Sequence, residues 1–158
     1  MVSRMTSLGW MYLRQRSLLR EWNAHNPAVT QTLTKITIPK IKLEDVVLEG
    51  VSDESLMLGP AHMQGSVEPG MPGNAVLAGH RDSFFRPLKD IQTGDTIRLT
   101  TLDDVKEYRV VSTKIVPPTD TSVLDHRTSD RTLVLVTCYP FYYIGPAPKR
   151  FIVEAVQN

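Results

Sequence analysis

Four consecutive aliphatic residues, Leu133–Val136, constrain the fold of this chain more than any other feature of its sequence. A strand with one face in solvent alternates apolar and polar residues, whereas this segment is apolar at every position. We therefore expect a strand that is buried on both faces. Its carboxyl end carries Cys138, the only cysteine among the 158 residues.

Short segments with strand character make up most of the chain beyond Asn26-Pro27. An alternating apolar pattern runs from Ile36 to Leu43, and Pro39 within it indicates an edge strand or a bulge. Strong turn signals such as Pro72-Gly73 and Pro117-Pro118 separate the segments. This spacing predicts a mainly β fold, either a closed barrel or a sandwich. The further strand candidates are Val46–Glu49, Asn74–Gly79, Thr96–Thr100, Lys106–Val116, Thr132–Cys138 and Lys149–Val156.

Residues 1–30 are expected to form a helix and a linker, and residues 31–158 the β domain. Between Leu8 and Trp22 apolar residues recur at steps of three and four, which predicts an amphipathic helix. Two interpretations stay open: a helix that packs its apolar stripe on the domain, and a basic helix at a membrane surface. Shorter helical pieces are expected at Ser83–Lys89 and Asp120–Asp125. The apolar stripe consists of Leu8, Met11, Tyr12, Leu18, Leu19 and Trp22.

The composition excludes several functional classes. A net charge of +1 with 22% charged residues leaves no basic stripe, so we expect no nucleic-acid partner. The histidines are scattered and the cysteine is single, so we expect neither a metal nor another cofactor. A spanning helix needs about 20 mostly apolar residues, whereas the longest early uncharged stretch runs only from Met5 to Leu13. No transmembrane segment is expected, and if the natural protein is membrane-anchored, this chain is a truncated form.

Cys138 is the candidate nucleophile. A thiol attacks a carbonyl as the thiolate, so a catalytic cysteine needs a nearby imidazole or positive charge and access to the substrate. Its place at the end of a buried strand, followed at once by Tyr139-Pro140, is expected to leave the sulfur at the rim of the domain. The competing interpretation is an inert core cysteine, because cysteine is among the most buried residue types.

His80 and Arg150 occupy comparable positions. His80 follows the strand candidate Asn74–Gly79 at its carboxyl end, as Cys138 ends its own strand. Arg150 begins the last strand candidate, and its planar fork of donors suits a carbonyl oxygen or a developing oxyanion. The plain alternatives are a histidine with ordinary structural partners and an arginine that is only a solvated charge.

These segments resemble the sortase family, and the resemblance extends from about Ile36 to Val156. The cysteine signature of the family, Thr-Leu-x-Thr-Cys in its commonest form, is matched at Thr137-Cys138, with the Thr-Leu pair displaced outward to Thr132-Leu133. The Asp-Pro-aromatic lid motif of pilus-building sortases is absent from the N-terminal region, which argues against a pilin polymerase. The combination of Cys138-Tyr139-Pro140-Phe141 with Ala147-Pro148-Lys149-Arg150 is most similar to class D-like sortases. The other similar segments are Ile38-Pro39-Lys40-Ile41, Leu58-Gly59-Pro60-Ala61-His62, Leu77-Ala78-Gly79-His80-Arg81-Asp82 and Lys149-Arg150-Phe151-Ile152-Val153.

The resemblance implies a closed sortase-type β-barrel of about eight strands with short helices, and cysteine transpeptidase activity. Cys138 would attack the threonine carbonyl of a Leu-Pro-x-Thr-(Gly or Ala) sorting motif, and an amine would resolve the thioester. His80 would shuttle the proton and Arg150 would stabilise the oxyanion. The implied partners are secreted proteins that bear the motif and an amine acceptor of the cell wall or another surface component. The implied location is the extracytoplasmic face of a bacterial membrane, near which the N-terminal region would lie.

Four weaker candidates for substrate contact each have a structural alternative. Thr137 either orients the substrate or is an ordinary β-branched strand residue. Tyr139 either lines a peptide groove or packs on the barrel. Asp82 either steers the catalytic imidazole or caps the next helical piece, and His62 either flanks the groove or is a solvated loop histidine.

Two other functional classes stay open. A cysteine peptidase or a peptidoglycan L,D-transpeptidase also uses cysteine and histidine. The Ser-x-Gly-Cys signature of the latter is missing, and papain-like enzymes place the cysteine before the histidine. The other class is a noncatalytic β-barrel binding module with an incidental cysteine. Thiol alkylation at neutral pH distinguishes it, because an inert buried thiol reacts slowly unless the protein unfolds.

Overall fold

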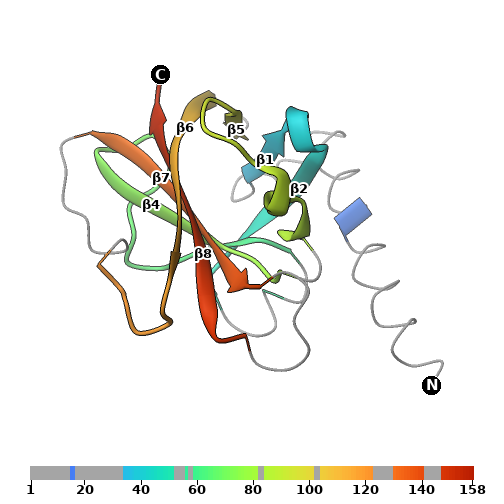
Figure 1. The fold of residues 1–158 in the computed structure, drawn as a ribbon. Helices are drawn as coiled ribbons and strands as arrows, with labels where there is room; N and C mark the ends of the chain where they lie inside the picture. The colour runs from blue at the N-terminus through green and yellow to red at the C-terminus, as the bar shows by residue number, and fades with distance from the viewer. Residues whose placement is uncertain are drawn as a thin grey trace.

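A closed β-barrel forms the body of the molecule in the computed structural model (Figure 1), which describes residues 15–16, 34–51, 56, 59–81, 84–101, 104–122, 130–140 and 147–158. The strand order around the barrel is β1-β2-β3-β4-β7-β8-β6-β5. This confirms the predicted mainly β, closed-barrel fold. The strands are β1 (Thr34–Ile38), β2 (Leu43–Glu49), β3 (Ala61–His62), β4 (Gly73–Ala78), β5 (Thr96–Thr100), β6 (Val105–Val116), β7 (Arg131–Tyr139) and β8 (Lys149–Gln157), and the 3-10 helices are η1 (Pro39–Ile41) and η2 (Arg86–Asp90).

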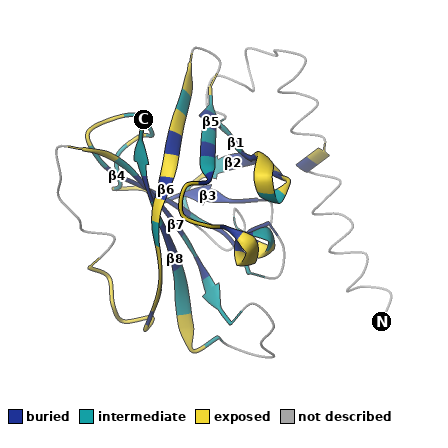
Figure 2. Cartoon of the chain, turned by 45° about the horizontal axis from the view of Figure 1, so that its top comes forward, coloured by how far each residue is buried: buried dark blue, intermediate teal, exposed yellow. Residues whose placement is uncertain are grey.

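Strand β7 separates two apolar clusters. Leu133 and Leu135 belong to the large cluster that fills the barrel. Val134 belongs to a second cluster on the opposite face, together with Val76 and Ile152. Most buried positions follow the strands (Figure 2). No residue of η1 is buried, whereas η2 buries Leu88 in the large cluster. The prediction of a strand covered on both faces is confirmed.

The alternating segment from Ile36 to Leu43 is not one strand. Pro39 begins η1, where its fixed φ suits the first helical turn. Lys42 adopts a left-handed conformation with φ 57°, and its N–H donates to the Pro39 carbonyl at 3.1 Å. The chain reverses here, and β1 pairs with β2 in antiparallel register. The expectation of an edge or bulge at Pro39 is therefore wrong, because the proline starts the turn between two strands.

The two shorter helical pieces have different outcomes. The piece expected at Ser83–Lys89 is the 3-10 helix η2, which begins later, at Arg86, and has a proline in its first turn. Of the piece expected at Asp120–Asp125, the described part ends at Ser122. There the Asp120 carboxylate accepts hydrogen bonds from the Ser122 backbone N–H and hydroxyl.

Gln15 joins the N-terminal region to the barrel. Of the helix expected between Leu8 and Trp22, only Gln15 and Arg16 lie within the described residues, and both are helical. The buried Gln15 amide donates to the Val46 carbonyl at 3.1 Å and accepts from the Val46 N–H at 2.9 Å. The side chain thereby pairs with a buried stretch of β2 as a neighbouring strand would. No helix in the described part of the chain is long and apolar enough to cross a membrane.

We expect Gln15→Ala to lower the free energy of unfolding by roughly 2 to 4 kcal/mol, since two buried backbone groups of Val46 lose their partner. Arg16→Ala is the matched control, because Arg16 is the exposed neighbour in the helix. A Cβ at Gly59 would lie 2.1 Å from the Gln15 amide nitrogen, so Gly59→Ala should break the same contact. Urea unfolding measures the free energy of unfolding of each variant. If the losses of Gln15→Ala and Gly59→Ala add in the variant that carries both, the two residues do not share one contact and the expectation is wrong.

Asp45 of β2 predicts a pH dependence of stability. Burial, helped by the charge of Glu44, raises the pKa of Asp45 from 3.8 to about 7. The native state then binds this proton more tightly than the unfolded state, so stability is highest below the unfolded pKa and falls as pH rises toward 7. Asp45→Asn should match the wild type near pH 4 and exceed it at pH 8 by at least about 1 kcal/mol. Urea unfolding at both pH values measures this, and a variant weaker than wild type at pH 8 would refute it.

Candidate active site

The three predicted catalytic residues lie at the same end of three neighbouring strands. Cys138 on β7 is the direct register partner of Arg150 on β8. Strand β4 runs parallel to β7 with Ala78 opposite Val136, and the Gly79 N–H donates to the Val136 carbonyl at 3.1 Å. Continuing this register by two residues places His80 beside Cys138. The order across the sheet is therefore histidine, cysteine, arginine.

The side chains of these residues share the outer face of the barrel. Successive side chains of a strand alternate between its faces, and Val134 belongs to the cluster outside the barrel, so Cys138 points outward. Ile152 and Val76 belong to the same cluster. Ile152 lies two residues after Arg150 and Val76 four residues before His80, so the alternation puts both site positions on that face as well. Cys138 is half-buried, so the residue keeps some contact with solvent. The alternative of an inert core cysteine is not supported by this placement.

Phe85 holds the backbone around His80. Its N–H donates to the His80 carbonyl at 3.1 Å, and its ring is fully buried in the core. A Cβ at Gly79 would lie 2.7 Å from this ring, closer than any real contact. Only glycine lets the strand end approach the ring so closely. The sequence shows Gly79 beside His80 but gives no sign that Phe85 is its partner.

Arg150 is oriented by its own chain segment. One guanidinium nitrogen, Nη1, donates to the Lys149 carbonyl at 2.9 Å and to the Ala147 carbonyl at 3.3 Å. Among the described residues, no carboxylate lies within ion-pair distance of this guanidinium, and the side chain is half-buried. Its charge is thus not neutralised by a described acid, and the planar group has further donors for a ligand oxygen.

Thr137 and Tyr139 alternate with Cys138 and belong to the opposite face. Thr137 is buried, and its hydroxyl has no hydrogen-bond partner among the residues that the structure describes. The Tyr139 ring stacks on Phe151, with centroids 6.2 Å apart and planes at 24°. For both residues the structure favours the packing alternative over substrate contact.

His62 is neither solvated nor in a loop, so the expectation of a solvated histidine is wrong. It lies in β3, is buried, and is the register partner of Glu49 on β2. Burial alone lowers the pKa of His62, but its bonds to the Val67 carbonyl and Glu49, and the charges of Glu49 and Glu68, raise it overall. No described contact joins it to Cys138. The last weaker candidate, Asp82, lies outside the described residues.

The arrangement is suited to acyl transfer. A thiol can attack a carbonyl, an imidazole beside it can take and return the proton, and a guanidinium on the other side can stabilise the negative oxygen. Backbone pairing of β7 with β8 places Cys138 and Arg150, and His80 follows β4 by two residues where the Gly79 N–H bonds to the Val136 carbonyl.

Comparison with known proteins identifies relatives. The model of the Sortase domain matches residues 36–158, which lie inside the domain expected at 31–158. Sortase D of Bacillus subtilis (strain 168) is 39% identical over 127 residues, 80% of this chain and 64% of that protein. Sortase A of Listeria monocytogenes is 36% identical over 107 residues, 65% of this chain and 47% of that protein. The chain thus spans about half to two thirds of the length of these relatives.

A solved structure gives the same result for the fold. The structure of a Clostridium perfringens Sortase D5 transpeptidase superposes with a TM-score of 0.76 at 26% identity. The match covers 93% of this chain and 97% of that one.

Proposed function

Because the chain belongs to the sortase family, we propose that it is a cysteine transpeptidase that cleaves a Leu-Pro-x-Thr-(Gly or Ala) sorting motif and joins the threonine to an amine. The observation that supports this proposal is the pairing of Cys138 with Arg150, together with the Ala78–Val136 pairing that ends β4 two residues before His80. A class D-like sortase is the subgroup that we propose, and the Sortase D relative supports it.

The proposed reaction has two halves. The Cys138 sulfur attacks the threonine carbonyl, the peptide bond to the next residue breaks, and a thioester forms. His80 protonates the departing amine. In the second half His80 removes a proton from the incoming amine, which attacks the thioester and releases the Cys138 thiol. Both tetrahedral states carry a negative oxygen that the Arg150 guanidinium stabilises.

The proposed partners follow from this chemistry. The substrate is a secreted protein with the sorting motif near its C-terminus, and the acceptor is an amine of the cell wall or another surface component. The proposed site of action is the outer face of the cell membrane. A water molecule in place of the amine would give hydrolysis, which is the competing outcome for the same acyl-enzyme.

One incubation tests substrate and outcome together. The protein is mixed with a library of Leu-Pro-x-Thr peptides and a small amine, and products are identified by mass. We expect cleavage after threonine and amide products with the added amine. If only free acids form, the protein is a hydrolase, and if no peptide is cut, the proposed substrate class is wrong.

We expect Arg150→Lys to lower kcat/KM at least about tenfold, roughly 1.4 kcal/mol of transition-state stabilisation. Lysine retains the charge, but an ammonium on a flexible stem does not reproduce a planar fork held by two carbonyls. Lys149→Ala, which removes the exposed neighbouring charge, should change kcat/KM much less. Steady-state kinetics with one sorting peptide decide whether Arg150 acts through its oriented planar group or only through its positive charge. Near-normal kinetics for Arg150→Lys would reduce this residue to a general positive charge.

A further inference from the structure

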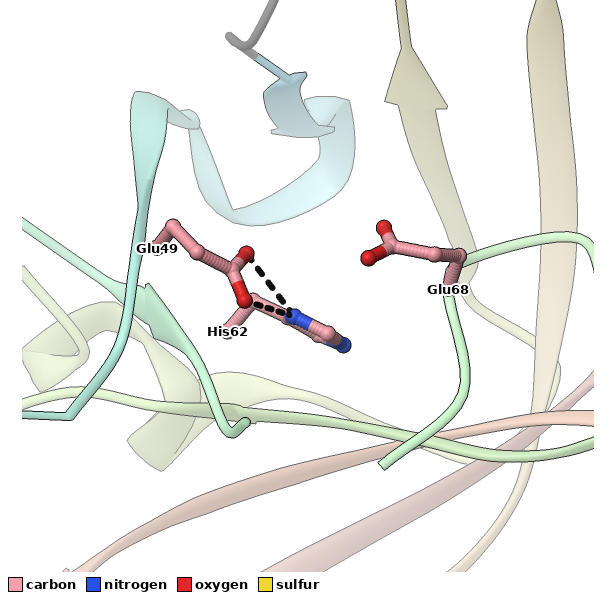
Figure 3. A group of neighbouring side chains, drawn as sticks. All are labelled: Glu49, His62 and Glu68. Atoms are coloured by element: carbon pink, nitrogen blue, oxygen red, sulfur yellow. Dashed lines mark hydrogen bonds and ion pairs between the residues drawn. The ribbon is translucent and has the colours of Figure 1, made fainter. Parts of the chain in front are cut away.

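Glu49, His62 and Glu68, none of them among the proposed catalytic residues, bring three potential metal ligands together (Figure 3). Glu49 ends β2, His62 lies on β3, and Glu68 belongs to the loop between β3 and β4. One ligand atom from each lies within 4.8 Å of the others. The histidine side chain is only 5% exposed, whereas both carboxylates reach solvent.

Hydrogen bonding assigns the proton of the His62 ring. Its Nε2 lies 2.9 Å from the Val67 carbonyl, which only accepts, and 3.0 Å from the Ser66 hydroxyl. That hydroxyl has one hydrogen, which it donates to the Met63 carbonyl at 2.6 Å. Nε2 therefore faces two acceptors and must carry the hydrogen.

The other ring nitrogen then faces an acceptor. In the neutral ring with hydrogen on Nε2, Nδ1 presents a lone pair. Both carboxylate oxygens of Glu49 lie close to it, at 2.9 and 3.0 Å, and Figure 3 shows the Glu49 carboxylate pointing at this nitrogen. Two acceptors at this distance repel each other unless a cation lies between them. The cation is either a proton or a metal ion.

The charge and chemistry of the group favour a divalent metal ion. Two carboxylates bring two negative charges to the group, and a divalent ion engages both as ligands, whereas a proton shared between His62 and Glu49 leaves Glu68 out. An imidazole that binds a metal characteristically donates its other N–H to a carbonyl, as His62 does to Val67. Calcium and magnesium prefer oxygen ligands alone, whereas zinc accepts nitrogen and oxygen in tetrahedral sites.

We propose that Glu49, His62 and Glu68 form a zinc-binding site with a fourth position open to water. Tetrahedral zinc bonds of about 2.0 to 2.2 Å set the ligand atoms roughly 3.3 to 3.6 Å apart. The Glu49 oxygen, now 2.9 Å from Nδ1, would move slightly away, and Glu68 would move in, which its exposed place on a loop allows. A bound ion would join β2 and β3 to the loop before β4. The Ser66 hydroxyl already accepts from the Val76 N–H of β4 at 3.2 Å, so the ion would brace that strand as well.

Calorimetric titration of the full chain with zinc chloride at pH 7.5 tests the proposal. Zinc also binds thiolates, so the titrations use Cys138→Ala, which removes the only cysteine. We expect the titration to give one zinc ion per chain. In separate thermal melts the melting temperature should rise with zinc concentration until the site is full, and calcium or magnesium should have no comparable effect. Affinity should fall at lower pH, because protons compete for Nδ1.

Variants of the exposed ligands separate this site from adventitious binding. Glu68→Gln and Glu49→Gln should each weaken zinc binding at least about tenfold. Glu44→Gln, another exposed acid of β2 outside the cluster, should not. His62→Ala should abolish binding, but the two glutamine variants keep the test decisive if that variant does not fold. Absence of zinc binding, or binding unchanged in both glutamine variants, overturns the proposal and leaves a proton between His62 and Glu49.

Discussion

Replacing Cys138 with alanine is expected to abolish peptide cleavage in a chain that still folds. No other thiol exists in the sequence to form the acyl-enzyme. The loss in kcat should be at least about a thousandfold, or roughly 4 kcal/mol, because the covalent route disappears altogether. Alanine removes only the sulfur of a half-buried residue and leaves the backbone pairing with Arg150 in place, so the strand should be unaffected.

Product analysis by chromatography measures this loss, and circular dichroism with thermal melting shows whether the variant is folded. The melting temperature should stay close to that of the wild type. More than a trace of cleavage by folded Cys138→Ala would refute the proposed nucleophile.

His80→Ala is expected to lower kcat/KM by about 10² to 10⁴, the usual contribution of a positioned acid and base. The parallel pairing of β4 with β7, extended by two residues, brings His80 beside Cys138, whereas His62, the other histidine in the described part of the chain, has no described contact with Cys138. Added imidazole should restore part of the activity, because it can occupy the vacated space and carry the proton. A role limited to folding would not respond to imidazole.

His126→Ala serves as the comparison for that variant. Steady-state kinetics over a range of pH, with and without imidazole, should show a large loss only for His80→Ala. If His126→Ala is the impaired enzyme and His80→Ala is nearly normal, the acid and base are wrongly assigned.

The strands were predictable where local pattern determines them. Leu133–Val136 is apolar at every position, so burial on both faces can be predicted without knowing the partner strands. Turn signals such as Pro117-Pro118 mark strand ends because proline and glycine restrict the backbone locally. The candidate site rests on the same local signals, since Cys138 lies at the end of one recognisable strand and His80 follows another.

What escaped prediction depends on contacts between distant segments. His62 appeared to be a loop residue because β3 has only two residues and exists through pairing with β2 and β4. Gln15 lies three residues from Tyr12 and from Leu18, on the apolar stripe, yet nothing local shows that its amide pairs with Val46. The contacts of Glu49 with His62 likewise follow only from the β2 and β3 register.

Trapping the acyl-enzyme tests the central claim most directly. The protein is mixed with a Leu-Pro-x-Thr-Gly peptide, quenched in acid within seconds, and its intact mass is measured. We predict a mass increase equal to the peptide up to and including threonine, located on the fragment that contains Cys138. A small amine added before the quench should remove the adduct and appear in an amide product. Cleavage without such an adduct on wild-type protein, or an adduct that persists in Cys138→Ala, would contradict the account.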